Sequence, residues 1–289
     1  MNKIEIHNDI VYNSKAKKDI TLIHLGDIHF NITTNIKKLD KIKEAIYKNN
    51  PDYVVITGDT IDNPQVTKDK IRIKKLLLFL TDISNFTKVI ISLGNHDVYI
   101  KEHHKFFQNL NDLKNIYILD NEAYIDEEIY ISGFTLPATY YYNITRNESK
   151  EALIEHLKKN KKLTYNLPLK LPKVGLIHSP ILLTDKDVLT QLNEYDLLLS
   201  GHTHGGMVPK FLSKFFKKNQ GIIAPNKKIL PEVARGKIEN YIKDKKITLI
   251  ITSGITKLSL HSAKILNKLN FVYNIDINKI IITSKKGRY

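Results

Sequence analysis

Residues 20–29 read Ile20-Thr21-Leu22-Ile23-His24-Leu25-Gly26-Asp27-Ile28-His29, a mostly apolar run that ends on a glycine and two polar side chains. Apolar residues on both alternating faces are typical of a strand that is covered on both sides of its sheet. The same features, an apolar run and then a glycine with a polar cluster, return several times along the chain. They predict a buried sheet whose strand ends carry the functional side chains.

Further apolar runs predict strands at residues 53–57, 89–93, 129–134, 174–178, 197–200 and 247–252. Amphipathic helical patterns lie between them at residues 35–48, 66–79 and 148–157. Strands that alternate with helices favour a layered α/β fold. Near the C-terminus, residues 271–275 and 279–283 are predicted to pair as a hairpin around residues 276–278. Because no Pro/Gly/Ser-rich linker divides the chain, we expect one domain over residues 1–289, with the polar motifs in 22–206 and the last strands and hairpin in 207–289.

The composition narrows the chemistry that is available. The chain has 289 residues, of which 42% are hydrophobic and 26% charged, and it has no cysteine. Disulfides, thiolate zinc sites and cysteine nucleophiles are therefore excluded. Carboxylate, imidazole and amide groups remain as metal ligands, and they suit hard or borderline divalent cations. The start of the sequence has no apolar run of about 7–15 residues, as a signal peptide needs, so we expect a cytoplasmic protein.

The net charge of +15 has two interpretations. It favours an anionic partner such as a phosphoester, a nucleic acid or a lipid surface. It is equally explained by a composition bias toward lysine. The segment 210–218, Lys-Phe-Leu-Ser-Lys-Phe-Phe-Lys-Lys, leaves a similar choice between peripheral contact with an anionic membrane and a core-facing aromatic stripe.

Five of the predicted strand ends carry polar side chains that suit metal binding or proton transfer. These are Asp27 with His29, Asp59, Asn95 with His96 and Asp97, His178, and His202 with His204. The carboxyl ends of strands in α/β sheets meet at the ligand crevice, so these groups are expected to converge. A glycine precedes four of the clusters and permits a tight turn there. His24, alone on an apolar strand, is expected to be a core residue.

The order D-x-H, G-D, G-N-H-D, strand-end His and G-H-T-H resembles the calcineurin-like metallophosphoesterase superfamily over roughly residues 22–206. The ending G-H-T-H-G-G is similar to its small bacterial phosphodiesterase branch, although Met207 stands where that branch usually has Gln. The resemblance implies an α/β/β/α fold, a β-sandwich flanked by helices. It also implies two divalent metal ions, with manganese favoured and iron, zinc or cobalt as alternatives.

The resemblance further implies a role for each motif residue. Asp27, His29 and His204 would bind one metal, Asn95, His178 and His202 the other, and Asp59 both. His96 would assist the leaving group, and Asp97 would orient His96. Two metals lower the pKa of a shared water, and the resulting hydroxide attacks the phosphorus of a phosphoester, most readily a phosphodiester. A nuclease of the same superfamily and a non-catalytic metal-binding scaffold are the alternatives.

Overall fold

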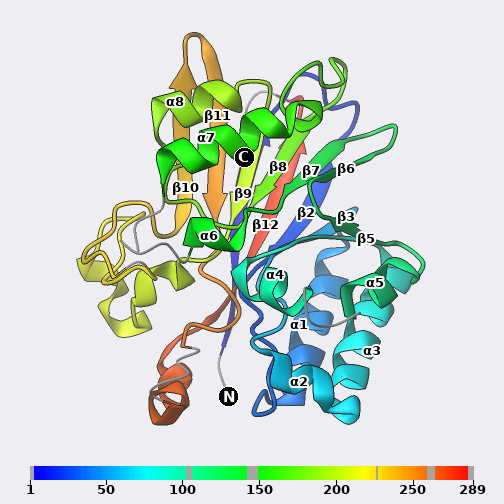
Figure 1. Ribbon diagram of the computed structural model, residues 1–289, viewed down its shortest axis with the longest axis vertical. Coiled ribbons are helices and arrows are strands. Elements are labelled where there is room, and N and C mark those ends of the chain that lie inside the picture. Colours follow the sequence, from blue (N-terminus) through cyan, green and yellow to red (C-terminus); the bar gives the residue numbers. More distant parts are fainter. Residues whose placement is uncertain (1–2, 102–105, 142–148, 226, 259–263, 286–289) are drawn as a thin grey trace.

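The computed structural model describes residues 3–101, 106–141, 149–225, 227–258 and 264–285 (Figure 1). Its centre is formed by two six-stranded sheets. In order across the first sheet the strands are β1 (Ile4–Tyr12), β12 (Ile275–Thr283), β2 (Ile20–Leu25), β3 (Tyr53–Thr57), β4 (Lys88–Ser92) and β5 (Ile116–Leu119). The second sheet has β10 (Gly236–Ile242), β11 (Lys245–Ile251), β9 (Leu197–Ser200), β8 (Lys173–Ile177), β7 (Tyr130–Phe134) and β6 (Glu122–Ile125).

Both sheets are mixed. Strands β2 to β5 are parallel to one another, as are β7, β8, β9 and β11. The strands β12, β6 and β10 are antiparallel to a neighbour. The parallel strands therefore deliver their carboxyl ends to one end of each sheet.

Helices cover the outer faces of the two sheets. The α-helices are α1 (Ile36–Asn49), α2 (Pro64–Lys68), α3 (Lys70–Phe86), α4 (Asn95–Lys101), α5 (Phe106–Asn111), α6 (Ala138–Tyr141), α7 (Lys150–Lys159) and α8 (Lys186–Gln191). Short 3-10 helices are η1 (Lys161–Leu163), η2 (His204–Met207), η3 (Lys210–Phe215) and η4 (Lys264–Val272). In Figure 1 α7 and α8 lie over the second sheet, and α1 and α3 lie beside the first.

Alternation along the strands builds three apolar layers. Leu22 packs between the sheets, whereas its neighbour Ile23 packs against the helices that cover the first sheet. A third layer lies between the second sheet and α7 and α8. Successive strand residues point to opposite faces, so strands that are apolar at every position fill both a central and an outer core. The predicted α/β/β/α sandwich is confirmed.

Two predictions of secondary structure are wrong. Residues 271–283 do not form a hairpin: η4 ends at Val272, and β12 runs without a turn from Ile275 to Thr283. The polar residues that suggested a turn are buried inside the strand, where Asp276 pairs with Lys257 and His7. The helix predicted at 66–79 is instead two helices, because the side chain of Asp69 caps a new start at α3.

For the segment 210–218, the structure contradicts one of the two interpretations given above. Its 3-10 helix η3 has no buried residue, and Phe211 and Phe215 are 68% and 81% exposed. A core-facing stripe is therefore wrong for this segment. Among the described residues, no helix has both the length and the apolar character needed to cross a membrane.

Candidate metal centre

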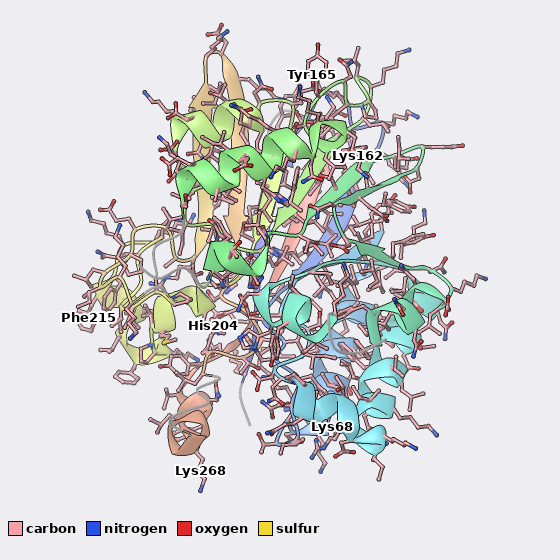
Figure 2. The ribbon with its side chains drawn as sticks, viewed as in Figure 1. Lys68, Lys162, Tyr165, His204, Phe215 and Lys268 are labelled. Carbon is pink, nitrogen blue, oxygen red and sulfur yellow. The ribbon has the colours of Figure 1, made fainter. Side chains whose placement is uncertain are left out.

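The predicted ligands converge where strands of both sheets end. Asp27 and His29 follow β2, Asp59 follows β3, and Asn95 begins α4 directly after β4. From the second sheet, His178 follows β8, and His202 and His204 follow β9. All seven side chains are buried. Figure 2 labels His204 between the two halves of the molecule, below the strand ends.

The ligand atoms fall into two groups that meet at Asp59. Asp27, His29 and His204 form one group, and Asp59, His178 and His202 form the other, with the ligand atoms of each group within 4.8 Å of one another. Asp59 Oδ2 lies 3.5 Å from His29 Nε2 and 3.3 Å from His178 Nε2. Asp59 thus occupies the position that a bridging ligand needs.

The chain on both sides of Asn95, the remaining predicted ligand, contacts Asp59. The N–H of His96 donates to Asp59 Oδ1 at 2.9 Å. On the other side, Gly94 packs against the Asp59 carboxylate so closely that a Cβ there would collide with Oδ1. The backbone on both sides of Asn95 is therefore fixed against Asp59, and the buried Asn95 side chain starts from that point.

Hydrogen bonds to the Nδ1 atoms set the orientation of four histidine rings. His178 Nδ1 donates to the carbonyl oxygen of Thr57 at 2.6 Å, and His204 Nδ1 donates to that of Thr256 at 2.7 Å. A carbonyl oxygen only accepts, so the proton must sit on Nδ1. His29 Nδ1 donates to Asp62 Oδ1 at 3.1 Å, and His96 Nδ1 to the Asp62 carbonyl oxygen at 2.5 Å. Each bond assigns Nε2 to the centre, which is how protein groups orient metal-binding histidines.

Burial keeps three of the four histidines predicted as ligands neutral. It lowers the pKa of His204 to about 4, and it lowers the pKa values of His29 and His202 as well. For His178 burial acts in the same direction, but the adjacent Asp59 carboxylate outweighs it and raises the pKa to about 9. Metal binding requires a neutral imidazole nitrogen, so three rings are ready for a cation, and at His178 a cation would replace a proton.

Five of the ligand residues have a left-handed backbone. Asp27, His29, Asp59, His202 and His204 have φ between 45° and 68°. This region is uncommon for residues other than glycine, and its occurrence in one cluster is typical of functional sites. The turns were expected at the glycines that precede the clusters, but of these four glycines only Gly58 has a positive φ. Gly201 instead makes room, since a Cβ there would lie 2.8 Å from Asp27 Oδ2.

Asp97 was expected to orient and charge-stabilise His96. Burial lowers the pKa of His96, while the charges of Asp59 and, to a smaller extent, Asp97 raise it, so the electrostatic part of that role is present. The hydrogen bonds of Asp97 go elsewhere. Its carboxylate accepts hydrogen bonds from the backbone N–H groups of Thr60, Ile61 and Gly94, at 3.0 to 3.2 Å. It therefore fixes the loop that carries Asp59, and the ring of His96 is held by the Asp62 carbonyl oxygen. Burial, reinforced by Asp59, raises the pKa of Asp97 to about 7.

The contributions of Asp62, Thr57 and Thr256 to the site were not predicted from the sequence. Asp62 orients two rings, and together with His29 and His96 it forms another group that could hold a metal. The carbonyl oxygens of Thr57 and Thr256 have no side-chain signature at all. The ring of Tyr141, next to residues outside the described part, lies 5.3 Å from the ring of His202. His24 is confirmed as a buried core residue, and its Nε2 bonds to Thr57 Oγ1 at 2.9 Å.

The donor set fits divalent cations. Two buried carboxylates face imidazole nitrogens, and the buried His29 Nε2 has no hydrogen-bond partner. Ligands that share a cation at roughly 2.0–2.2 Å lie about 3–4 Å apart, close to the separations seen at Asp59. Mixed oxygen and imidazole ligation is typical of zinc, manganese and iron sites.

Comparison with known proteins agrees with this geometry. The profile of the calcineurin-like phosphoesterase family matches residues 20–206. The chain belongs to the calcineurin-like phosphoesterase family. An uncharacterized metallophosphoesterase of Campylobacter jejuni is 28% identical, over 72% of this chain and 50% of the relative. A second uncharacterized metallophosphoesterase, from Helicobacter pylori, is 27% identical over 70% of this chain and 49% of its own length.

The phosphoesterase chain spans about half the length of these curated relatives. Among solved structures, a dimetal phosphatase from Danio rerio is 10% identical with a TM-score of 0.42. That alignment covers 83% of this chain and 89% of the other. The family match covers every ligand from Asp27 to His204, so it coincides with the part of the chain that builds the centre.

Proposed function

We propose that this phosphoesterase hydrolyses phosphodiesters with two divalent cations held by Asp27, His29 and His204, and by Asn95, His178 and His202, with Asp59 shared between them. The observation that carries the proposal is the pair of ligand groups that meet at the Asp59 carboxylate. When bound, two divalent cations would neutralise the phosphoryl oxygens and lower the pKa of the attacking water. Manganese is the cation that we propose, by resemblance to the superfamily.

The chain's own residues prepare the site for this chemistry. Asp62 fixes the ring of His96 through its carbonyl oxygen and so places the proton of the neutral ring on Nδ1. Because Nδ1 already holds one proton, His96 acts as an acid only in its imidazolium form, whose second proton is on Nε2. Burial lowers the pKa of His96, but neighbouring groups, the Asp59 carboxylate first among them, outweigh burial and raise it, which favours that form. The Nε2 proton passes to the leaving oxygen and leaves the neutral ring, in a step that is typically worth roughly 10²–10⁴-fold in rate. Asp97 acts as a positioning residue, because it fixes the loop of Asp59 rather than touching a reacting atom.

A diester carries a second substituent, which needs room beside the centre. A cavity of about 240 Å³ begins at His29 and is lined further out by Asn31, Thr34 and Lys38. Lys38 Nζ donates to Thr256 Oγ1 at 2.9 Å, on the residue whose carbonyl oxygen holds His204. Burial, reinforced by the charge of Lys257, lowers the pKa of Lys38 to about 7, so an anionic ester bound beside it would favour its charged form. We extend the proposal to residues 1–289 acting as one phosphoesterase domain.

The deciding experiment compares bis(p-nitrophenyl) phosphate with p-nitrophenyl phosphate as substrates of the Mn²⁺-loaded protein. Asp59→Asn is expected to abolish turnover, because both ligand groups lose their shared carboxylate. Asp40→Asn makes the same chemical change at an exposed position of α1 and serves as the control. A preference for the monoester would overturn the phosphodiester assignment. Bound Mn²⁺ without turnover of either substrate would favour the scaffold alternative, and a DNA oligonucleotide cleaved faster than both would favour the nuclease.

His96→Asn separates the proton donor from the metal ligands. We expect kcat to fall by about 10²–10⁴-fold while the affinity for Mn²⁺ stays within a fewfold of the parent protein. Isothermal titration with Mn²⁺ and steady-state kinetics on the same preparation measure both quantities. A variant that keeps kcat within about tenfold would remove His96 from the mechanism, and one that loses Mn²⁺ would make it a ligand.

A further inference from the structure

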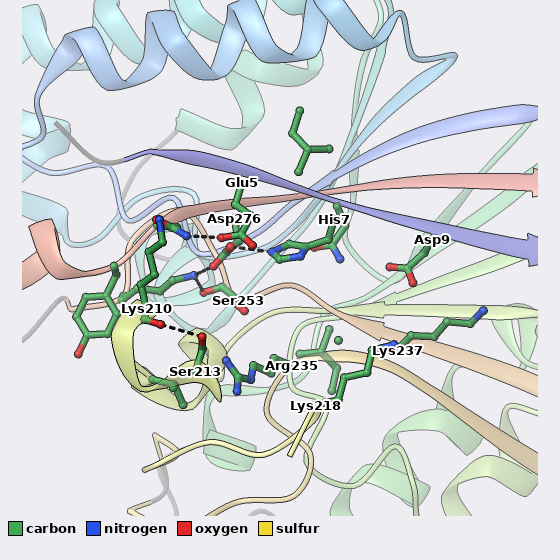
Figure 3. A pocket seen from close by; sticks show the side chains of 18 of the residues that line it. Glu5, His7, Asp9, Lys210, Ser213, Lys218, Arg235, Lys237, Ser253 and Asp276 are labelled. Atoms are coloured by element: carbon green, nitrogen blue, oxygen red, sulfur yellow. Dashed lines mark hydrogen bonds and ion pairs between the residues drawn. The ribbon is translucent and has the colours of Figure 1, made fainter. Parts of the chain in front are cut away.

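A second cavity of about 590 Å³ lies at the open edge of the sandwich, where β1 of one sheet faces β10 of the other (Figure 3). Its walls come from β1, β12, η3, β10 and the loop after β11. A volume of this size is typical of small-molecule sites, which span roughly 300–1,000 Å³. None of the seven metal ligands lines it.

One wall of this cavity is basic. Arg235, Lys210 and Lys218 line it, and among the described residues no carboxylate forms an ion pair with any of the three. Arg235 is half-buried, and its buried Nε has no hydrogen-bond partner. A buried N–H donor without a hydrogen-bond acceptor is costly, and such donors are rare in folded proteins. Burial lowers the pKa of Arg235, and the Asp276 carboxylate across the cavity opposes that shift.

The facing wall is acidic, and the most buried of its carboxylates, Asp276, is matched by cations within the protein. Asp276 accepts from His7 Nε2 at 2.8 Å and from Lys257 Nζ at 2.5 Å. Glu5 accepts from the side chain of Asn274. Figure 3 shows Asp276, Glu5 and His7 together on one side, with Arg235 and Lys218 on the other. Asp9 also lines the cavity, so among the described residues three cations without an ion pair, Arg235, Lys210 and Lys218, stand against two carboxylates without one, Glu5 and Asp9. The cations are in excess.

We propose that this cavity is a second ligand site, in which Arg235, Lys210 and Lys218 bind a phosphate or similar oxyanion. A guanidinium presents parallel N–H donors that match two oxygens of such a group, and lysines add charge to the same pocket. The carboxylates of the facing wall accept hydrogen bonds, so the rest of the ligand would carry hydroxyl or amino donors. The ligand class is a small phosphorylated polyol or amino alcohol, either free or as the headgroup of a lipid.

The site lies back to back with the metal centre and does not depend on it. Ser253 lines the cavity, while its neighbour Gly254 packs against Asp27, where a Cβ would come within 2.7 Å of Asp27 Cβ. Lys257 Nζ fixes this partition by donating to the carbonyl oxygens of Ser253 and Gly254. Anion binding at Arg235 therefore requires no metal, which separates this proposal from the phosphoesterase proposal.

Isothermal titration of the full chain with inorganic phosphate tests the site, once with EDTA and once with Mn²⁺. Arg235→Ala is expected to weaken the metal-independent binding at least about tenfold, as expected for the loss of a charge-assisted hydrogen bond, and Lys218→Ala to weaken it less. Lys214→Ala is the control that matches Lys218→Ala. Lys214 is an exposed lysine of η3, the helix that also carries Lys210, and it does not line the cavity. Phosphate binding that needs Mn²⁺, or that Arg235→Ala and Lys214→Ala weaken equally, would overturn the proposal.

A second pair of titrations identifies the source of the oxyanion. One uses glycerol 3-phosphate, and the other uses vesicles of phosphatidylcholine with phosphatidylglycerol, since the exposed Phe211 and Phe215 lie on η3 beside the cavity. The ligand whose binding is weakened by Arg235→Ala is the source. Arg235→Lys keeps the positive charge and is the conservative control for a folding defect. The melting temperature of each variant without ligand reports such a defect directly. Affinity unchanged in both titrations would overturn the site.

Discussion

Two groups of charged residues, a partly buried one around Asp126 and a buried one around Asp59, balance the charge of their carboxylates in different ways. At the edge near β6, Asp126 Oδ2 accepts from Tyr53 Oη at 2.6 Å, Tyr124 Oη at 2.7 Å and Lys88 Nζ at 2.8 Å. Burial opposes the charge, but Lys88 and Tyr53 outweigh it, and the pKa of Asp126 falls well below its usual value. This carboxylate is neutralised entirely within the chain.

The metal centre treats its two carboxylates differently. Burial, reinforced by the neighbouring Asp59, raises the pKa of Asp27, whereas at Asp59 burial is outweighed by His178 and His96, and the pKa lies well below its usual value. Among the described residues, no lysine or arginine forms an ion pair with either carboxylate. A buried carboxylate without a cation is costly to fold around. The comparison shows which charge each region lacks: Lys88 balances Asp126, whereas among the described residues no lysine or arginine pairs with Asp27 or Asp59, as the proposed cation sites require.

Added metal should separate variants of the two groups by the largest change in the free energy of unfolding. We expect Mn²⁺ at 100 to 1,000 times its dissociation constant to raise the free energy of unfolding by about 3–4 kcal/mol. Asp59→Asn should lose that increment, and Asp126→Asn should retain it. Thermal denaturation with Mn²⁺ and with EDTA measures the increment in all three proteins. An increment that survives in Asp59→Asn would show that the cation binds elsewhere.

Asp126→Asn should instead reduce stability without metal. The amide would present donors to Tyr53, Tyr124 and Lys88, so we expect a loss of about 2–3 kcal/mol at pH 7. Because the folded pKa of Asp126 is lowered, its contribution is present above the unfolded pKa near 3.9 and disappears as the pH falls through the folded value. Urea titrations at pH 7 and pH 3 should show the difference from the parent protein shrink at low pH. A constant difference would assign the loss to packing.

Asp27→Asn should raise the free energy of unfolding in EDTA, whereas Asp126→Asn lowers it. The folded pKa of Asp27 is raised, so its ionised form penalises the folded state at neutral pH, and removing the charge is expected to stabilise by roughly 1 kcal/mol. The left-handed backbone at this position also tolerates asparagine. Urea unfolding at pH 7 in EDTA measures the change, and Mn²⁺ should reverse the ranking. Destabilisation in EDTA would mean that the hydrogen bonds from the His202 N–H outweigh the buried charge.

The sequence predicted the parts of the site that side-chain type and strand position determine. Asp59, His178 and His204 were found because each follows a buried apolar run, and parallel strands bring those positions together. The edge strand β1 was missed, because its alternating polar residues weaken the apolar run. The carbonyl oxygen of Thr256 carries no residue-type signal, so its bond to His204 depends on tertiary structure alone.

Two errors share one physical cause. Asp276 and Asn278 suggested a turn because polar residues usually end strands, yet Asp276 lies within β12, buried against Lys257. Asp97 was assigned to His96 by resemblance to the superfamily, yet its carboxylate accepts hydrogen bonds from backbone N–H groups of the loop after β3. In both cases a partner distant in sequence decides where a charged side chain lies, and local pattern holds no record of that partner.

The pair of His7 and Asp276 provides an intermediate case with the smallest expected effect. The hydrogen bond to Asp276 raises the pKa of His7, although burial opposes the shift. A raised histidine pKa contributes stability below the unfolded value near 6.5, and this contribution is lost as the pH rises through the folded value. Since the His7 side chain is 43% exposed, solvent screening limits the contribution to a few tenths of a kcal/mol. His7→Asn should therefore be slightly less stable than the parent at pH 6 and equal to it at pH 9, as judged by urea unfolding. A difference that does not change with pH would show that the ring contributes through packing, and that the acidic wall of the cavity, like the Asp126 group, is balanced without it.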